Sequence, residues 1–169
     1  MKTAFKSLIR HHLEYCCQLW SPKARHGNWR VILDIEGVQR NFTRVIDGME
    51  NFSYRERLKT LGLTTLLERR MRGDLIETFK TLNDFNNYGK TFFNLSERTN
   101  NLLVRPNTRN LDFFGERVIN YWNKLPEYVK NKNSVNSFKN SLDKFRENGI
   151  KTNLIGQYWE LSEEIFKRI

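Results

Sequence analysis

The residues of this chain that could act on another molecule are mainly arginines, and several recur at helical spacing. Arg40 and Arg44 are four residues apart, and Arg69 and Arg72 are three apart. Residues at these spacings share one face of an α-helix. Cations along a helix face can contact the phosphate backbone of a nucleic acid, which positions a protein without reading sequence. We therefore interpret these four arginines as candidate backbone contacts.

The same arginines have a second explanation, in which they belong to a solvated helix face. Glu36 stands four residues before Arg40, and Glu68 stands four residues before Arg72. Opposite charges at this spacing form ion pairs on a helix surface. The sequence leaves both explanations open.

Two further arginines lie where the helical pattern is lost. Arg105 and Arg109 follow Phe92 and Phe93 in a polar, turn-rich stretch. Basic residues interleaved with aromatic ones can hold single strands by stacking and charge. The alternative is that these aromatic side chains belong to the core.

Catalytic and metal-binding motifs are not found in the sequence. There is no G-x-S-x-G and no glycine-rich phosphate loop. His12 and Cys16 are four residues apart, a spacing that can place two metal ligands on one helix face. No second ligand pair at such spacing follows, so we expect no metal, no other cofactor and no enzymatic activity, and we place His12 on a buried helix face.

The overall composition favours an acidic partner. The 169 residues carry a net charge of +10 with a pI near 9.8, and the charge is spread along the chain. Nucleic acid is the usual polyanion for such a protein, although a basic balance can also serve solubility alone. The 12 Phe, 6 Tyr and 4 Trp supply area for a core.

Two observations bear on location. Cys16 and Cys17 are adjacent and fit a reducing compartment, so we expect an intracellular protein, nuclear or cytoplasmic. No apolar run approaches the ~20 residues that cross a bilayer, so no membrane partner is expected.

Hydrophobic periodicity predicts a mainly α fold: one helical domain of six to seven helices with one long irregular connection. A short strand is expected near 101–105. The predicted helices span about 3–20, 29–47, 53–61, 65–83, 113–124 and 135–147, with a short one after Ser162. Gly149 is expected to end the helix predicted at 135–147.

The predicted helix at 29–47 has one apolar stripe, which we expect to be buried. Its residues are Val31, Ile35, Val38, Phe42 and Val45, at steps of four and three. The arginine face lies opposite, so we expect it to remain outside. The next helix shows a capping box, Ser53 with Glu56, and Gly62 as its C-terminal cap.

Five phrases, in this order and spacing, resemble the segment downstream of the reverse-transcriptase palm in jockey-like non-LTR retrotransposons. They are LIRHHLEYCCQLWSP (Leu8–Pro22), EGVQRNFTRVI (Glu36–Ile46), SYRERLKTLGLTTLLERRMRGDLIETFK (Ser53–Lys80), FFGERVINYWNKLPEYV (Phe113–Val129) and SVNSFKNSLDKF (Ser134–Phe145). The resemblance covers roughly residues 4–146.

The resemblance implies a thumb and post-thumb region without its catalytic centre. In the family, an RNA-directed DNA polymerase uses palm aspartates, two of them in an F/Y-x-D-D turn, to hold Mg²⁺. No two aspartates are adjacent here. The fingers and palm of the parent polyprotein would lie before Met1 and would be partners of this chain. The thumb of such polymerases grips the template–primer duplex through its backbone.

From these arguments we expect residues 1–149 to form the thumb-like helical domain and residues 150–169 a C-terminal extension. The expected function is non-catalytic gripping of an RNA or RNA–DNA duplex by a fragment of a retrotransposon polymerase. The alternative is a protein–protein interaction or self-association module derived from such a fragment. The expected nucleic-acid contacts are Arg40, Arg44, Arg69, Arg72, Arg105 and Arg109.

Overall fold

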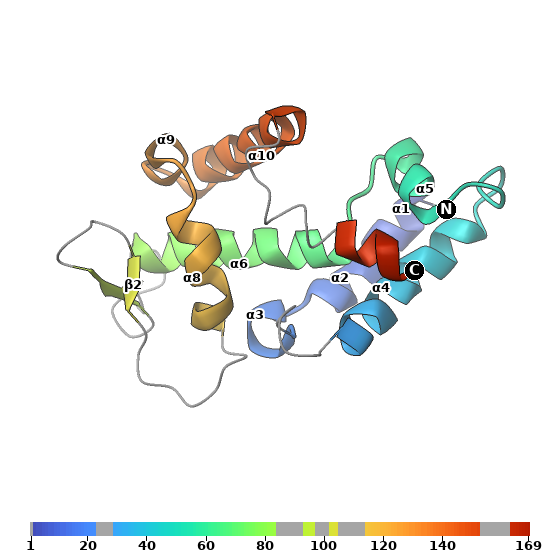
Figure 1. Cartoon of the computed structure of the whole chain (residues 1–169), viewed down its shortest axis with the longest axis horizontal. Coiled ribbons are helices and arrows are strands. Elements are labelled where there is room, and N and C mark those ends of the chain that lie inside the picture. The colour runs from blue at the N-terminus through green and yellow to red at the C-terminus, as the bar shows by residue number, and fades with distance from the viewer. Residues whose placement is uncertain (1, 23–28, 84–92, 97–101, 105–113, 153–162) are drawn as a thin grey trace. The chain divides into compact units, whose positions relative to one another are not determined.

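The computed structural model describes residues 2–22, 29–83, 93–96, 102–104, 114–152 and 163–169 (Figure 1). This part of the chain is mainly helical, which confirms the predicted fold class. It falls into two compact units. Unit 1 comprises Met1–Arg70 with Gln157–Ile169, and unit 2 comprises Met71–Gly156. The expected division at residue 149 stays a prediction.

Unit 1 begins with a broken helix, so the single helix predicted for 3–20 is wrong. The segments are α1 (Lys2–Ala4), the π-helical η1 (Phe5–Ile9), α2 (Arg10–Glu14) and α3 (Cys17–Trp20). The break falls at Cys16, whose φ of 47° is left-handed. The Trp20 indole N–H donates to the carbonyl of Tyr15 at 2.6 Å and closes the turn. The pattern of apolar residues could not reveal this break, because apolar residues lie both before and after it.

Two helices follow in unit 1, α4 (Trp29–Arg44) and α5 (Tyr54–Leu61). The predicted capping box is present: the Ser53 hydroxyl accepts from the Glu56 N–H, and the Glu56 carboxylate accepts from the Ser53 N–H at 2.8 Å. Gly62 ends α5 with φ 57°, a conformation that favours glycine. The N-terminal segment lies along α4, where Phe5 stacks on Phe42 with ring centroids 4.7 Å apart (Figure 1).

Helix α6 (Leu66–Leu82) contributes to both units, because their boundary lies between Arg70 and Met71. Its apolar residues Leu67, Met71, Leu75 and Phe79, at steps of four, are buried. In unit 1, Leu67 joins Ile32 and Ile165 in a small core, with Trp29 and Leu33 packed against it. Ile165 belongs to a short helix at residues 163–168, which fits the helix predicted after Ser162.

Unit 2 continues from α6 through a two-stranded sheet to three helices. β1 (Asn94–Leu95) pairs antiparallel with β2 (Leu102–Val104). β2 lies within 101–105, where a short strand was expected, whereas β1 was not predicted. The helices are α8 (Phe114–Asn123), α9 (Glu127–Lys130) and α10 (Val135–Thr152). Helix α10 runs past Gly149, so the predicted stop there is wrong. One glycine costs a helix only about 1 kcal/mol relative to alanine, which does not force an end.

The centre of unit 2 is aromatic. Phe79 of α6 stacks on Phe138 of α10 with centroids 4.4 Å apart, and the Trp122 ring of α8 lies 5.8 Å from Phe138. Phe79, Phe138 and Trp122 are all at most 3 % exposed. These rings therefore join the three long helices of the unit.

The face of α4 that packs inward is not the one predicted from its apolar stripe. Val31, Val38 and Val45 are 49 %, 40 % and 61 % exposed. Residues completely buried on α4 are Ile32, Glu36, Gln39 and Thr43, also at steps of four and three. The predicted burial of the valines is thus wrong, because polar groups with hydrogen-bond partners can be buried in place of apolar ones.

Among the residues that the structure describes, no helix has the length and apolar character needed to cross a bilayer.

Candidate nucleic-acid interface

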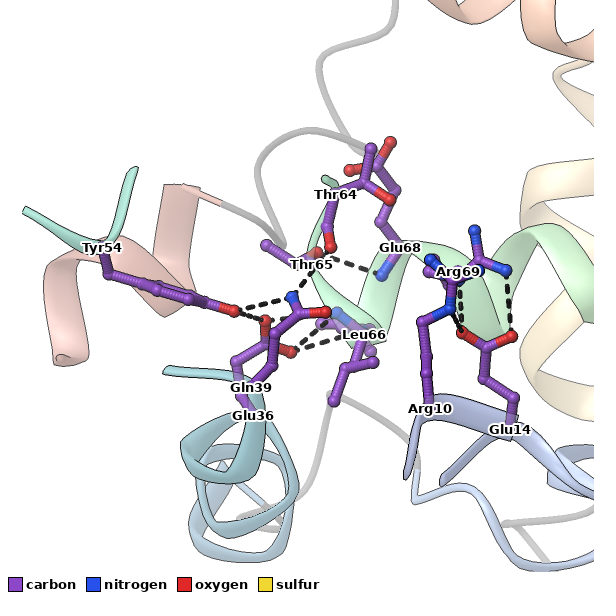
Figure 2. A network of polar contacts seen from close by, with 11 residues as sticks. Arg10, Glu14, Glu36, Gln39, Tyr54, Thr64, Thr65, Leu66, Glu68 and Arg69 are labelled. Atoms are coloured by element: carbon purple, nitrogen blue, oxygen red, sulfur yellow. Dashed lines mark hydrogen bonds and ion pairs between the residues drawn. The ribbon is translucent and has the colours of Figure 1, made fainter. Parts of the chain in front are cut away.

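The orientation of α4 is set by the carboxylate of Glu36, which caps the N-terminus of α6 (Figure 2). The Leu66 N–H donates to Glu36 at 2.9 Å and the Leu67 N–H at 3.4 Å. The next N–H of that turn, from Glu68, donates to the Thr65 hydroxyl at 3.2 Å. The first N–H groups of a helix lack partners within it and carry partial positive charge, so a buried carboxylate is stabilised there.

Tyr54 and Gln39 complete this buried polar network. The Tyr54 hydroxyl donates to the Glu36 carboxylate and accepts from the Gln39 amide at 2.9 Å. The same amide donates to the carbonyl of Thr64 at 3.0 Å. Helices α4 and α5 and the start of α6 are therefore joined through side chains that are 0–6 % exposed.

Burial is the largest influence on the pKa values of Glu36 and Tyr54 in this network. Loss of solvent raises the pKa of Glu36, although the Tyr54 hydroxyl, the charge of Arg70 and the helix N–H groups act in the opposite direction. The pKa of Tyr54 is also raised, first by burial and then by the neighbouring negative charge of Glu36. The raised pKa of Tyr54 agrees with the role of its hydroxyl as donor to Glu36.

Arg57 of α5 holds the C-terminal end of α4. Its guanidinium donates to the Phe52 carbonyl at 2.5 Å, to the Thr43 hydroxyl at 3.2 Å and to the Arg40 carbonyl at 3.3 Å. The last carbonyls of a helix carry partial negative charge, so a cation is favourable there. Burial lowers the pKa of Arg57, and the charges of Arg44 and Arg40 lower it further. Three arginines therefore gather at this helix end.

Two of these arginines, Arg40 and Arg44, are the candidate phosphate contacts. Arg44 is exposed and Arg40 is half-buried. Within the described part of the chain, neither guanidinium forms an ion pair. The pair expected between Arg40 and Glu36 does not form, because the Glu36 side chain lies in the buried network. The arginine face of the sequence prediction is thus left available by the fold.

Arg69 and Arg72 are engaged differently. Arg69 makes a two-bond ion pair with Glu14, which Arg10 also approaches at 3.5 Å (Figure 2). Arg72 makes a two-bond pair with Asp143 of α10, with both distances 2.7 Å. Helical spacing suggested neither partner, since both are distant in sequence. These ion pairs make Arg69 and Arg72 weaker candidates for phosphate contact than Arg40 and Arg44.

The remaining predicted contacts, Arg105 and Arg109, lie outside the described residues, as does Phe92. Phe93 is described and is 6 % exposed, with its ring 5.6 Å from that of Phe114. The core alternative therefore holds for Phe93, which cannot stack on a nucleic-acid base from this position.

The predicted burial of His12 is wrong. His12 is exposed and its ring lies 3.9 Å from that of His11. Cys16 lies beyond the end of α2 in the left-handed conformation, so it does not share a helix face with His12. In the described ranges, no three His, Cys, Asp or Glu residues are grouped as metal ligands.

Unit 2 contains a buried ion pair that sequence reasoning missed. The Arg117 guanidinium donates to the Asp74 carboxylate at 2.7 and 3.1 Å, and the side chains are 3 % and 0 % exposed. The available signal was a charged residue at helical spacing from an apolar one: Asp74 lies three residues after Met71, and Arg117 lies three residues after Phe114. The pair links two helices and is structural.

Comparison with known proteins finds no matching family model, no matching curated protein and no matching solved structure.

Proposed function

We propose that this chain binds the sugar–phosphate backbone of an RNA or RNA–DNA duplex without catalysing a reaction, and that it derives from the thumb and post-thumb region of a jockey-like retrotransposon polymerase. The observation that carries the binding proposal is the pair Arg40 and Arg44 at the end of α4, two guanidinium groups without an ion pair among the described residues. The origin rests on the five sequence phrases. The proposed partners are that duplex and the fingers and palm of the parent protein.

Geometry and charge both support backbone contact. The two arginines are one helical turn apart, and arginine matches phosphate oxygens through paired N–H donors. The buried charge of Arg57 lies close enough to influence its neighbours and adds to the positive potential. A net charge of +10 strengthens attraction to any polyanion. No residue in this cluster reads a base edge, so the binding is independent of sequence.

The acidic residues of the following loop do not cancel this cluster. Asp47 and Glu50 are exposed, and in the described part of the chain neither forms an ion pair with Arg40 or Arg44. Glu50 accepts instead from the Gly48 N–H at 3.3 Å.

The direct test is charge reversal. The double variant Arg40→Glu/Arg44→Glu should weaken binding to a labelled RNA–DNA duplex by tenfold or more, as measured by fluorescence anisotropy at about 50 mM salt. Both side chains reach solvent, so circular dichroism should show an unchanged helical content.

The matched control is Lys139→Glu/Lys144→Glu on α10, which changes the net charge equally. If Arg40 and Arg44 contact phosphate, this control loses less affinity than the arginine variant. Equal losses would mean that overall charge, and not this site, governs binding.

The alternative is self-association, and the exposed stripe Val31, Val38 and Val45 on α4 favours it. The charge of +10 on each copy opposes it. Sedimentation equilibrium separates the two. A mass that rises with concentration and falls again in Val38→Lys, together with no affinity for nucleic acid, would support self-association over backbone binding.

A further inference from the structure

The turn between α2 and α3, defined here as the Tyr15–Trp20 turn, presents large side chains to solvent on unit 1. Tyr15 is 74 % exposed, Leu19 is 82 % exposed and Trp20 is 41 % exposed. Single exposed apolar residues are common on protein surfaces, but three large ones within six residues of sequence offer apolar area to a partner. None of the arginines at the end of α4 belongs to this turn.

Contacts within unit 1 hold the Trp20 side chain of this turn in place. The Trp20 indole N–H is occupied by the Tyr15 carbonyl, so the exposed part of Trp20 is its ring carbon surface. The Arg70 guanidinium lies 5.7 Å from the Trp20 ring centroid and donates to the Ser21 hydroxyl at 3.1 Å. These contacts fix one side of the ring. The Trp20 ring is therefore presented in a fixed orientation, which lowers the cost of ordering it on binding.

The backbone of this region is unusual at two points. Cys16 has a φ of 47°, which non-glycine residues rarely adopt, and η1 is π-helical. Such conformations persist where the surrounding contacts impose them, and they concentrate at functional sites. The left-handed residue lies inside the turn, between Tyr15 and the pair Leu19 and Trp20.

The surroundings of the turn are cationic. Glu14 precedes it and is bound by both Arg10 and Arg69, and Arg70 lies at Trp20. Arg10 and Arg69 share the single negative charge of Glu14, which leaves one positive charge in excess beside the turn. A partner that matches the turn is consequently anionic and carries flat apolar rings.

We propose that the Tyr15–Trp20 turn binds single-stranded nucleic acid, with unpaired bases stacked on Tyr15 and Trp20 and the strand attracted by the net positive charge of the Arg10–Glu14–Arg69 group. The inference extends the proposed nucleic-acid binding, on which it rests, to a second surface and a second form of the ligand. Bases are accessible for stacking when they are unpaired, whereas a duplex offers a side chain its backbone and grooves. An acidic peptide with apolar residues is the competing partner, and Leu19 distinguishes the two, because an aliphatic side chain does not stack.

The test uses the full chain and a fluorescein-labelled oligo(U) RNA of about 12 nucleotides, with binding followed by anisotropy. Tyr15→Ala should weaken binding by about tenfold, because stacking on an aromatic ring is lost. Tyr15→Phe keeps the ring and should bind like the parent. The Tyr15 side chain is mostly exposed, so neither change should alter the fold, which circular dichroism checks.

Leu19→Ala is the matched control on the same turn. Stacking predicts that it binds oligo(U) as the parent does. Equal weakening in Leu19→Ala and Tyr15→Ala, or no weakening in Tyr15→Ala, would overturn the inference.

The Arg40→Glu/Arg44→Glu variant separates this inference from the duplex proposal. If duplex binding fails while the Tyr15-dependent binding of oligo(U) persists, the single-strand site stands and the duplex site does not. If duplex binding depends on the arginines while Tyr15→Ala leaves oligo(U) binding intact, the single-strand inference alone is wrong.

Discussion

At the scale of single residues, buried polar side chains determine how the helices of unit 1 are joined. Glu36 occupies the position where the N-terminus of α6 needs acceptors, and Tyr54 supplies a further donor to it. A buried polar group left without its partner costs about 1–3 kcal/mol, and a charged one costs more. The arginines that we propose as phosphate contacts depend on this arrangement, because it keeps Glu36 away from Arg40.

The first prediction concerns the pH dependence contributed by Glu36. Burial raises its pKa in the folded chain above the ordinary value of 4.5. The folded chain therefore retains a proton that the unfolded chain releases between the two pKa values. The stability contributed by Glu36 is fully present below pH 4.5 and is lost as pH rises through the folded pKa.

Glu36→Gln removes this titration. Urea unfolding from about pH 4 to about pH 8 should show the parent losing stability relative to the variant, by about 1.4 kcal/mol for each unit of pKa elevation. A stability difference that stays constant, or that rises in favour of the parent, would contradict the direction of the pKa shift.

The second prediction concerns the ion pair of unit 2. Arg117→Leu leaves Asp74 buried without its bidentate partner, so the free energy of unfolding should fall by about 3–5 kcal/mol. Adding Asp74→Leu should restore much of that loss, because no uncompensated charge then remains. Thermal unfolding of the two single variants and the double variant measures this coupling, and additive losses would show that the two residues act separately.

At the scale of elements, features that depend on neighbours in sequence were predicted, and features that depend on distant residues were not. The capping box of α5 and its glycine stop follow from neighbours in sequence, and both are present. The buried face of α4 was mispredicted because its partners are distant in sequence. Tyr54 and Leu66, which bond to Glu36, lie 18 and 30 residues after it. Hydrophobic periodicity ranks Val38 above Gln39 for burial, whereas hydrogen bonding across helices reverses that order.

The third prediction compares two glycines near α4. A Cβ at Gly37 would meet nothing within 4 Å, so Gly37→Ala should stabilise the chain by about 0.5–1 kcal/mol through helix propensity. Gly48 also has open space but a φ of +78°, so Gly48→Ala should destabilise the chain by about 1–2 kcal/mol. Chemical denaturation compares them, and shifts of the same sign would mean that backbone conformation is not the deciding factor.

At the scale of the molecule, helical class and most helix positions were predictable, while the division into two units was not. Length and composition do not locate the boundary between the two units, which falls within α6. The candidate site was partly predictable: helical spacing identified Arg40 and Arg44. The ion pairs of Arg69 and Arg72 required knowledge of Glu14 and Asp143, which are 55 and 71 residues distant.

The measurement that most directly tests duplex binding through α4 is the salt dependence of affinity. Each phosphate contact contributes about 0.9 to the slope of log Kobs against log salt on a B-form duplex. Neutral replacement in Arg40→Ala/Arg44→Ala should therefore reduce the magnitude of the slope for an RNA–DNA duplex by about two, measured from about 50 to about 200 mM salt. An unchanged slope would show that Arg40 and Arg44 do not contact phosphate.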